Sequence, residues 1–190
     1  MRVQSLAVPQ ATICLSAFTS PLGPMTLAAA TGEGLPEGGA VVGTWFDGQR
    51  HDRAGLTSDA RPLAPGAADE PPVLAQARAW LERYFDGEDP GPTPGLAVAG
   101  TDFQQRVWER LRTIPRGQTT TYGRIAADLA AATGRPASAR AVGVAVGRNP
   151  VSVLVPCHRV IRANGALTGY AGGPERKAAL LRLEGFVVLV

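Results

Sequence analysis

A proline- and glycine-rich segment, Asp89–Gly100 (DPGPTPGLAVAG), interrupts the chain near its middle and limits the folds open to it. Such a composition supports neither helix nor strand and is typical of a linker. Strand-like runs dominate before the segment, and helical patterns dominate after it. We therefore predict an N-terminal domain over 1–88, a linker over 89–100 and a second domain over 101–190. The fold class is α/β in the broad sense and α+β in the narrow one.

The two halves of the chain carry opposite charge. Residues 1–100 hold six arginines against eleven acidic residues, a net charge of −5. Residues 101–190 hold twelve arginines and the only lysine against five acidic residues, a net charge of +8. The overall charge of +3 conceals this division. A basic half beside an acidic half predicts a polyanionic partner for the second domain.

Composition excludes several other classes of protein. Hydrophobic residues make up 45% of the chain, which is enough for a packed core and excludes wholesale disorder. Two cysteines, Cys14 and Cys157, do not make a disulfide framework, and no spacing suggests a metal site. The first ten residues make a poor signal peptide, and no apolar run approaches the roughly 18 residues of a membrane span. We expect a cytoplasmic protein with no membrane contact.

The first half predicts a small antiparallel sheet with one helix. Three short apolar and β-branched runs are separated by turn residues. These runs are Ala11–Phe18, Met25–Ala30 and Ala40–Phe46. Residues His51–Glu70 show no periodicity and predict a loop. Apolar residues at three- and four-residue spacing then predict a helix over Pro72–Phe85.

The second half predicts a mainly helical domain with a helix-turn-helix. Thr101 and Gln104 form a capping-box pattern for a helix that runs to about Ile114. A second helix is predicted over Tyr122–Ala132, and a third over Pro136–Val146 with its proline near the first helical position. A last helix is predicted over Pro174–Leu183.

The third of these helices has almost no bulky side chain. Its sequence over Ala139–Gly147 is ARAVGVAVG, and Gly143 costs about 1 kcal/mol against alanine in a helix interior. One interpretation is close packing against another helix. The other is a slim helix that enters a narrow groove, such as the DNA minor groove of about 6 Å. The residues alone leave both open.

Cys157 is the candidate nucleophile. An apolar run, Val151–Val155, predicts a buried strand that ends just before Cys157, His158 and Arg159. A cysteine thiolate is nucleophilic, and neighbouring histidine or arginine lowers its pKa. The alternative is a small buried apolar side chain. A histidine acting as a base needs a carboxylate to orient it, and Glu184 at the end of the last helix is the best placed, unless it is simply a solvated helix end.

These motifs together resemble the O6-alkylguanine-DNA alkyltransferases, and most closely the bacterial stand-alone (Ogt-type) methylated-DNA–protein-cysteine methyltransferases. The match is close over 101–185 and looser before it. The segments that carry it are FQQRVW (103–108), TYG (121–123), RAVG (140–143), NPV (149–151), PCHRV (156–160), GYAGG (169–173) and EG (184–185).

The resemblance implies a role for each matching residue. Cys157 takes the alkyl group, His158 removes the thiol proton through a water, and Glu184 orients His158. Asn149 shapes the turn that holds the site. Tyr122 displaces a DNA phosphate and donates a proton toward the leaving base.

The resemblance also implies how DNA is held. The helix with Ala139, Ala141 and Gly143 lies in the minor groove, and Arg140 fills the gap left by a flipped nucleotide. The base pocket is formed by Val160, Tyr170 and Ala171. The first domain is expected to be ribonuclease-H-like.

The expected function is DNA repair by one irreversible alkyl transfer from O6-alkylguanine in double-stranded DNA, with O4-alkylthymine as a second candidate substrate. The enzyme is consumed in the reaction, works as a monomer and needs no cofactor or metal. The main alternative is a non-enzymatic lesion binder of the alkyltransferase-like kind, which lacks the reactive cysteine. A helix-turn-helix regulator and a Cys/His hydrolase fit less well. One departure from the family is the segment Ala126–Ser138, which is longer than usual.

Overall fold

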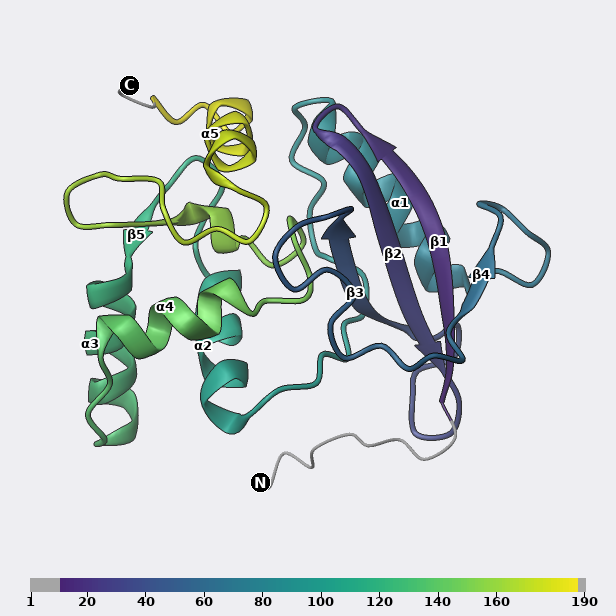
Figure 1. The fold of residues 1–190 in the computed structure, drawn as a ribbon, viewed down its shortest axis with the longest axis horizontal. Coiled ribbons are helices and arrows are strands. Elements are labelled where there is room, and N and C mark those ends of the chain that lie inside the picture. The colour runs from purple at the N-terminus through teal and green to yellow at the C-terminus, as the bar shows by residue number, and fades with distance from the viewer. Residues whose placement is uncertain (1–10, 188–190) are drawn as a thin grey trace. The chain divides into compact units, whose positions relative to one another are not determined.

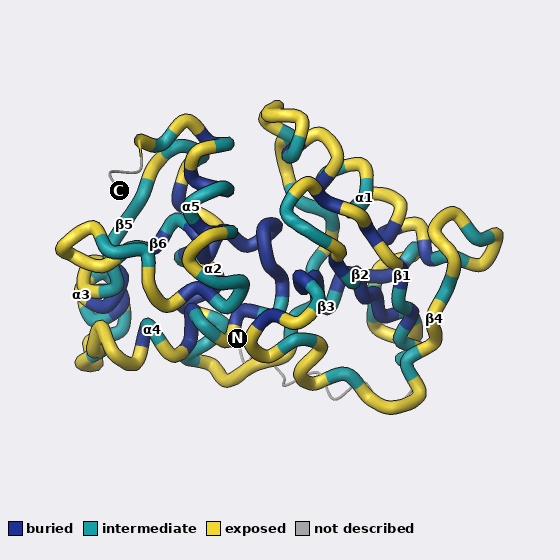
Figure 2. Tube along the Cα trace, turned by 45° about the horizontal axis from the view of Figure 1, so that its top comes forward, coloured by how far each residue is buried: buried dark blue, intermediate teal, exposed yellow. Residues whose placement is uncertain are grey.

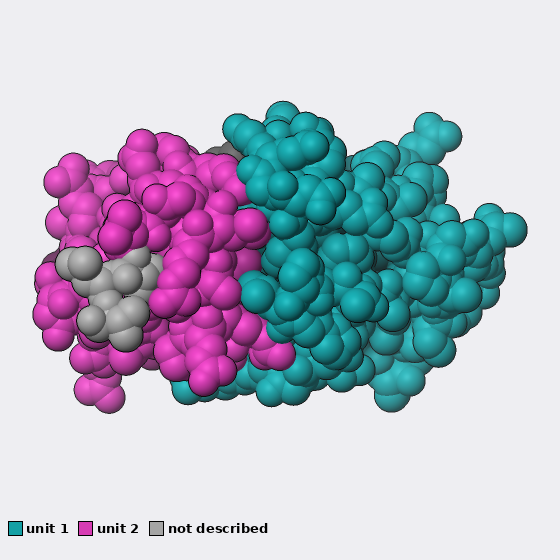
Figure 3. Space-filling view, turned by 90° about the horizontal axis from the view of Figure 1, so that it is seen from above, with its two compact units in different colours: residues 1–99, 150–154 teal, residues 100–149, 155–190 magenta. Residues whose placement is uncertain are grey.

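The computed structural model describes residues 11–187 and divides into two compact units (Figure 3). The first unit contains residues 1–99 together with Pro150–Leu154, and the second contains 100–149 and 155–190. Most of the predicted linker thus belongs to the first unit. The return of Pro150–Leu154 to the first unit has no signal in the sequence. The predicted domain division, 1–88 and 101–190 with a linker between them, stays a prediction.

The first unit is built on a four-stranded sheet in the order β3-β2-β1-β4. The strands β1 (Thr12–Ser20), β2 (Gly23–Thr31) and β3 (Ala40–Phe46) are antiparallel, which confirms the predicted sheet. The predicted loop over His51–Glu70 is wrong at one place, because β4 (Arg61–Leu63) pairs in parallel with β1. This strand escapes a periodicity search because it has three residues, lies at the sheet edge and contains a proline, which only an edge tolerates.

Helix α1 (Pro72–Phe85) has the predicted bounds and packs against one face of this sheet (Figure 1). Its buried residues recur at helical spacing: Val73, Leu74, Ala77, Leu81 and Tyr84. The matching sheet residues gather along β2 and β3, where Figure 2 shows the chain mostly buried. The apolar stripe read from the sequence is therefore the helical side of the first core.

The second unit contains α2 (Asp102–Arg112), α3 (Tyr122–Thr133), α4 (Ala139–Gly147) and α5 (Pro174–Leu183). The predicted capping box forms, since the Thr101 side chain accepts from the Gln104 N–H and the Gln104 side chain accepts from the Thr101 N–H. The Trp108 indole donates to the Ala145 carbonyl at 2.9 Å and so ties α2 to α4. Within residues 11–187, no helix has the length and apolar character needed to cross a membrane.

Helix α4 begins later than the sequence predicts. Pro136 is not at its first position, because the chain stays extended at Ser138, whose hydroxyl accepts from the Ala141 N–H at 3.1 Å. A serine cap satisfies a free N–H group, which proline cannot do. Residues 134–138 consequently form a connection between α3 and α4 that carries Arg135 and Pro136.

The predicted strand over Val151–Val155 is wrong. Val151 makes one isolated bridge to Thr44 of β3, and the following residues form turns with Val153 at a φ of 72°. The hydroxyl of Thr44 donates to the Ser152 carbonyl at 2.6 Å, which holds the turns in the first unit. The residues are buried as predicted, but an apolar run cannot reveal a left-handed valine.

Beyond these turns lies a short 3-10 helix, Cys157–Arg159, rather than the end of a strand. It leads into β6 (Val160–Ile161), which pairs in parallel with β5 (Thr120–Thr121) just before α3. The candidate nucleophile therefore lies on a helical turn between two tightly held segments.

Replacing Ser138 with alanine removes the cap of α4. We expect a loss of about 1 kcal/mol in the free energy of unfolding, because the Ala141 N–H loses its acceptor. Urea unfolding followed by tryptophan fluorescence measures the loss, since Trp108 contacts α4. The control is Ser58→Ala, at an exposed serine of the first unit, which we expect to change stability by less than about 0.5 kcal/mol. Equal effects of the two variants would contradict the capping role.

Candidate active site and nucleic-acid surface

Cys157 lies buried at the start of the 3-10 helix, 2% exposed. Its Sγ accepts a hydrogen bond from Asn149 Nδ2 at 3.1 Å, and the same amide nitrogen donates to the Val155 carbonyl at 3.0 Å. Asn149 thus holds both ends of the turn that carries the sulfur. Burial raises the pKa of the Cys157 thiol, and the Asn149 hydrogen bond together with the Lys177 charge only partly offsets it. The expectation of a lowered pKa is therefore wrong for the protein at rest.

Glu184 supplies the carboxylate around which the site is organised. Its Oε1 accepts from His158 Nε2 at 2.8 Å and from Arg159 Nη2 at 2.8 Å. Its Oε2 accepts from Arg159 Nε at 2.9 Å and from the Gly117 N–H at 3.2 Å. Burial alone raises the pKa of Glu184, but the hydrogen bonds from His158 and Arg159 outweigh it and hold that pKa well below the usual range.

The tautomer of His158 follows from this contact. An ionised carboxylate only accepts, so Nε2 carries the proton that is donated to Glu184, and the lone pair is on Nδ1. Burial lowers the pKa of His158, and the charges of Arg159 and Lys177 lower it further. The hydrogen bond and charge of Glu184 raise it, but by less. The imidazole is therefore neutral and able to accept a proton. The structure brings His158 and Glu184 together, as the sequence predicts.

Arg159 has a different position from the one its sequence neighbourhood indicates. Its guanidinium contacts Glu184 and donates to the Ile114 carbonyl at 2.6 Å, so it binds the carboxylate rather than the sulfur. Its positive charge also lowers the pKa of His158, in addition to the larger effect of burial.

Lys177 is the residue that sequence reasoning missed. It is fully buried on α5, and its ammonium donates to the carbonyls of Val160 and Thr168. No carboxylate in residues 11–187 pairs with it, and burial lowers its pKa to about 8. A buried cation near Cys157 favours the thiolate. The available signal was its singularity, one lysine among eighteen arginines.

Tyr122 begins α3 and points toward the loop before α5. Its hydroxyl donates to the Thr168 carbonyl at 3.0 Å, beside the bond from Lys177. Burial raises the pKa of Tyr122 to about 12. A Cβ at Gly169 would approach this hydroxyl to 2.5 Å, and Gly169 also has a φ of +86°, so only glycine fits here.

The predicted base-pocket residues follow the nucleophile in the same unit. Val160 is buried and offers its carbonyl to Lys177. The Tyr170 ring is buried, with its centroid 6.4 Å from that of His158 and nearly perpendicular to it. Ala171 is half-buried.

The outer face of α4 is smooth and uncovered. Ala139, Arg140 and Ala141 are exposed, and Val144 is 55% exposed. A Cβ added at Gly143 would meet only ordinary contacts with the Tyr122 ring, 3.7 Å away at the nearest. Packing within the protein therefore does not require a glycine there.

No metal site accompanies these residues. Over residues 11–187, no group of three or more histidine, cysteine, aspartate or glutamate side chains is arranged to hold an ion.

Replacing Glu184 with glutamine leaves His158 and Arg159 without their charged partner. We expect a loss of about 3 kcal/mol in the free energy of unfolding at pH 7. The pKa values of both Glu184 and His158 are lowered on folding, so the unfolded chain binds protons more readily and the wild type loses stability on acidification. The stabilisation that comes from ionised Glu184 is fully present above the unfolded pKa of about 4.5 and is lost progressively as the pH falls from there toward the lower folded pKa. Melting temperatures from pH 7 to pH 3 therefore converge for the two proteins.

The matched control is Glu175→Gln, at an exposed position in the first turn of α5. It changes stability by less than about 0.5 kcal/mol at any of these pH values. A constant gap between wild type and Glu184→Gln across the range would contradict a buried, charged Glu184.

Comparison with known proteins agrees with this geometry. A family model described as the DNA-binding domain of 6-O-methylguanine DNA methyltransferase matches residues 102–186. A methylated-DNA–protein-cysteine methyltransferase of Mycobacterium bovis is 46% identical over 165 residues, which cover 87% of this chain and 88% of the relative.

Solved structures give the same result. The crystal structure of the Mycobacterium tuberculosis O6-methylguanine methyltransferase matches with a TM-score of 0.72 and 41% identity, over 91% of this chain and 93% of that one. A crystal structure of Mycobacterium tuberculosis OGT in complex with DNA matches with a TM-score of 0.71 and 40% identity, over 90% and 92%. The chain belongs to the methylated-DNA–protein-cysteine methyltransferase family.

Proposed function

We propose that Cys157 accepts the alkyl group of O6-alkylguanine from double-stranded DNA in a single irreversible displacement. Family membership supplies the enzyme class, methylated-DNA–protein-cysteine S-methyltransferase, and the role in DNA repair. Two buried contacts carry the assignment to Cys157. His158 is hydrogen-bonded to Glu184, and the sulfur of the neighbouring Cys157 accepts a hydrogen bond from Asn149.

The proton of the thiol leaves first. Neutral His158 accepts it at Nδ1 through a bridging water, and ionised Glu184 stabilises the resulting imidazolium. The raised pKa of the Cys157 thiol keeps the sulfur protonated in the resting protein. The positive charge of Lys177 then favours the thiolate over the thiol.

The thiolate attacks the alkyl carbon. The S–C bond forms as the C–O6 bond breaks, and the electron pair of the broken bond stays on the guanine oxygen. Tyr122, whose pKa of about 12 keeps it protonated, turns its hydroxyl from Thr168 and donates a proton toward the departing base. The thioether product has no leaving group that water can displace, so each molecule acts once and needs no cofactor.

The guanine reaches Cys157 by leaving the duplex, because O6 cannot approach a buried sulfur while the base is stacked. We assign the smooth face of α4, with Ala139, Ala141 and Gly143, to the minor groove. Arg140, exposed and free of ion pairs within the described chain, fills the vacated place in the stack. Val160, Tyr170 and Ala171 enclose the flipped base.

The protein acts as a monomer in the cytoplasm, where the reducing environment keeps Cys157 as a free thiol. O4-alkylthymine is a second candidate substrate of the same chemistry. The non-enzymatic alternative, a lesion binder, is disfavoured because it requires no cysteine, base and carboxylate in register.

Intact mass measurement tests the reaction. Mixed with a duplex that carries O6-methylguanine, the wild type gains one methyl group, and Cys157→Ala gains none. Cys14→Ala, which removes the other buried cysteine, gains the methyl group like the wild type. An unchanged mass of the wild type under reducing conditions would overturn the proposal.

The role of Arg140 is tested by comparing two substrates. Arg140→Ala slows repair of the duplex by at least about tenfold, because the gap in the stack stays empty, while its reaction with free O6-benzylguanine is unchanged. Rates of methyl or benzyl transfer give both values. Equal losses on the two substrates would remove Arg140 from base flipping.

A further inference from the structure

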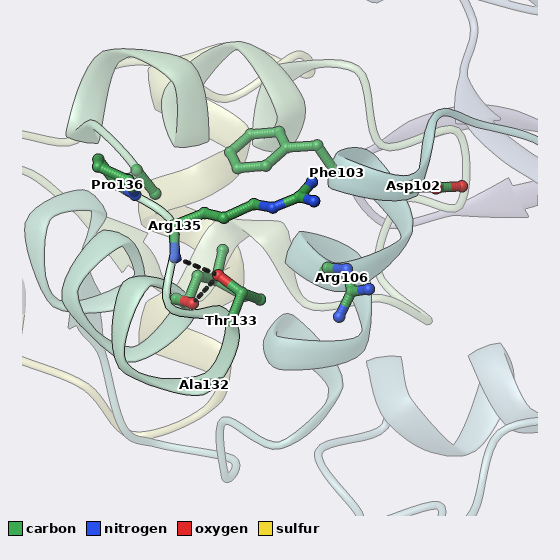
Figure 4. Close-up of a pocket in the computed structure, with 9 residues that line it drawn as sticks. Asp102, Phe103, Arg106, Ala132, Thr133, Arg135 and Pro136 are labelled. Atoms are coloured by element: carbon green, nitrogen blue, oxygen red, sulfur yellow. Dashed lines mark hydrogen bonds between the residues drawn. The ribbon is translucent and has the colours of Figure 1, made fainter. Parts of the chain in front are cut away.

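A pocket of about 710 Å³ lies in the second unit, apart from the Cys157 site (Figure 4). One wall comes from the start of α2, with Asp102, Phe103 and Arg106. The other comes from the end of α3 and the turn after it, with Thr133, Arg135 and Pro136. The second wall belongs to the longer Ala126–Ser138 segment. We call this hollow the Arg106–Arg135 pocket.

The arginines of this pocket differ from several others in the second unit. Arg110 and Arg124 contact Asp128, and Arg159 contacts Glu184. Arg106 and Arg135 are exposed, and neither guanidinium makes a hydrogen bond or ion pair with any residue in 11–187.

The carboxylate that lines the pocket does not neutralise them. Asp102 also lines the pocket, but it forms no ion pair with either arginine, and Figure 4 shows its side chain pointing away from Arg135. Two positive charges therefore converge on one hollow with a single acidic residue at its margin. Such an arrangement attracts an anion.

Phe103 connects this pocket to the α4 surface. Its ring is only half-buried, although the sequence places it on the apolar face of α2. It also lines a second, open hollow of about 430 Å³ with Ser138, Arg140 and Val144. The uncompensated arginines and the smooth face of α4 thus border one continuous stretch of surface.

We propose that the Arg106–Arg135 pocket binds phosphates of the DNA backbone, on the same duplex that α4 engages and outside the stretch that holds the reacting base. The inference rests on the proposed function. Guanidinium groups bind phosphate oxygens with charge-assisted hydrogen bonds, and the N-terminal turn of α2 adds N–H groups and a favourable dipole. Phosphate contacts fix the register of a protein on DNA without reading its sequence. The longer turn between α3 and α4 therefore extends the DNA footprint on one side of α4.

Salt dependence of binding to an unmodified duplex is the test. Each phosphate contact contributes about 0.9 to the slope of log K against log salt. We expect Arg106→Gln and Arg135→Gln each to reduce the slope by about 0.9 and the double variant by roughly 1.8. The matched control is Arg112→Gln, an exposed arginine on the same helix but outside the pocket, which leaves the slope unchanged. Melting temperatures show that all four variants are folded.

A series of duplexes shortened from either end locates the contact. We expect wild type and double variant to bind with equal affinity once the duplex is shortened at the end that reaches the pocket. When the other end is shortened by the same amount, their affinities continue to differ. Loss of the difference from both ends at equal lengths would contradict a one-sided contact.

Methyl transfer separates this inference from the proposed function. The double variant still methylates Cys157 completely and reacts with free O6-benzylguanine at the wild-type rate. A wild-type slope in the folded double variant would overturn the pocket assignment and leave alkyl transfer standing. A reduced slope without methyl transfer in the wild type would support the pocket and overturn the proposed function.

Discussion

The structure around Cys157 depends on keeping one carboxylate charged inside the protein. Removing an ion from water carries a large free-energy cost, and Glu184 offsets it with four hydrogen-bond donors from three residues in two separate segments. Each donor is thereby fixed: the Gly117 turn, the guanidinium of Arg159 and the imidazole of His158. The tautomer of His158, and with it the side of the ring that can accept a proton, follows from this one charge. Chemistry and stability in the second unit thus have a common origin.

The charges near the sulfur are balanced so that the thiol stays protonated in the resting protein. Arg159 compensates Glu184, and burial keeps both Cys157 and His158 neutral. Only Lys177 is a buried cation without a carboxylate partner in the described chain, and its charge is close to titration near neutral pH. The site therefore combines a buried thiol with a local positive potential. That potential favours the thiolate once His158 has accepted the proton.

Sequence patterns predicted the elements whose signal is local. The helices α1 and α5 and the cap at Thr101 were found because apolar spacing and capping residues act within a few positions. The turns at 151–155 were mistaken for a strand, since an apolar run shows burial but not φ at Val153. The start of α4 was misplaced because a proline signal competed with a serine cap. Cys157, His158 and Glu184 were singled out from their residue types and sequence context, and the family resemblance added their detailed roles. Lys177 and the orientation of Arg159 depend on contacts between distant segments and have no local pattern.

The return of Pro150–Leu154 to the first unit bears on how this enzyme can be divided or transplanted. The chain leaves the second unit after Asn149 and re-enters it at Val155, and these two residues are joined by a hydrogen bond. A fragment cut at the linker would keep every catalytic side chain yet lose Thr44 of β3, which bridges to Val151 and donates to the Ser152 carbonyl. Strand β3 of the acidic half thus supports the segment that leads to the nucleophile. A minimal catalytic module must therefore include β3.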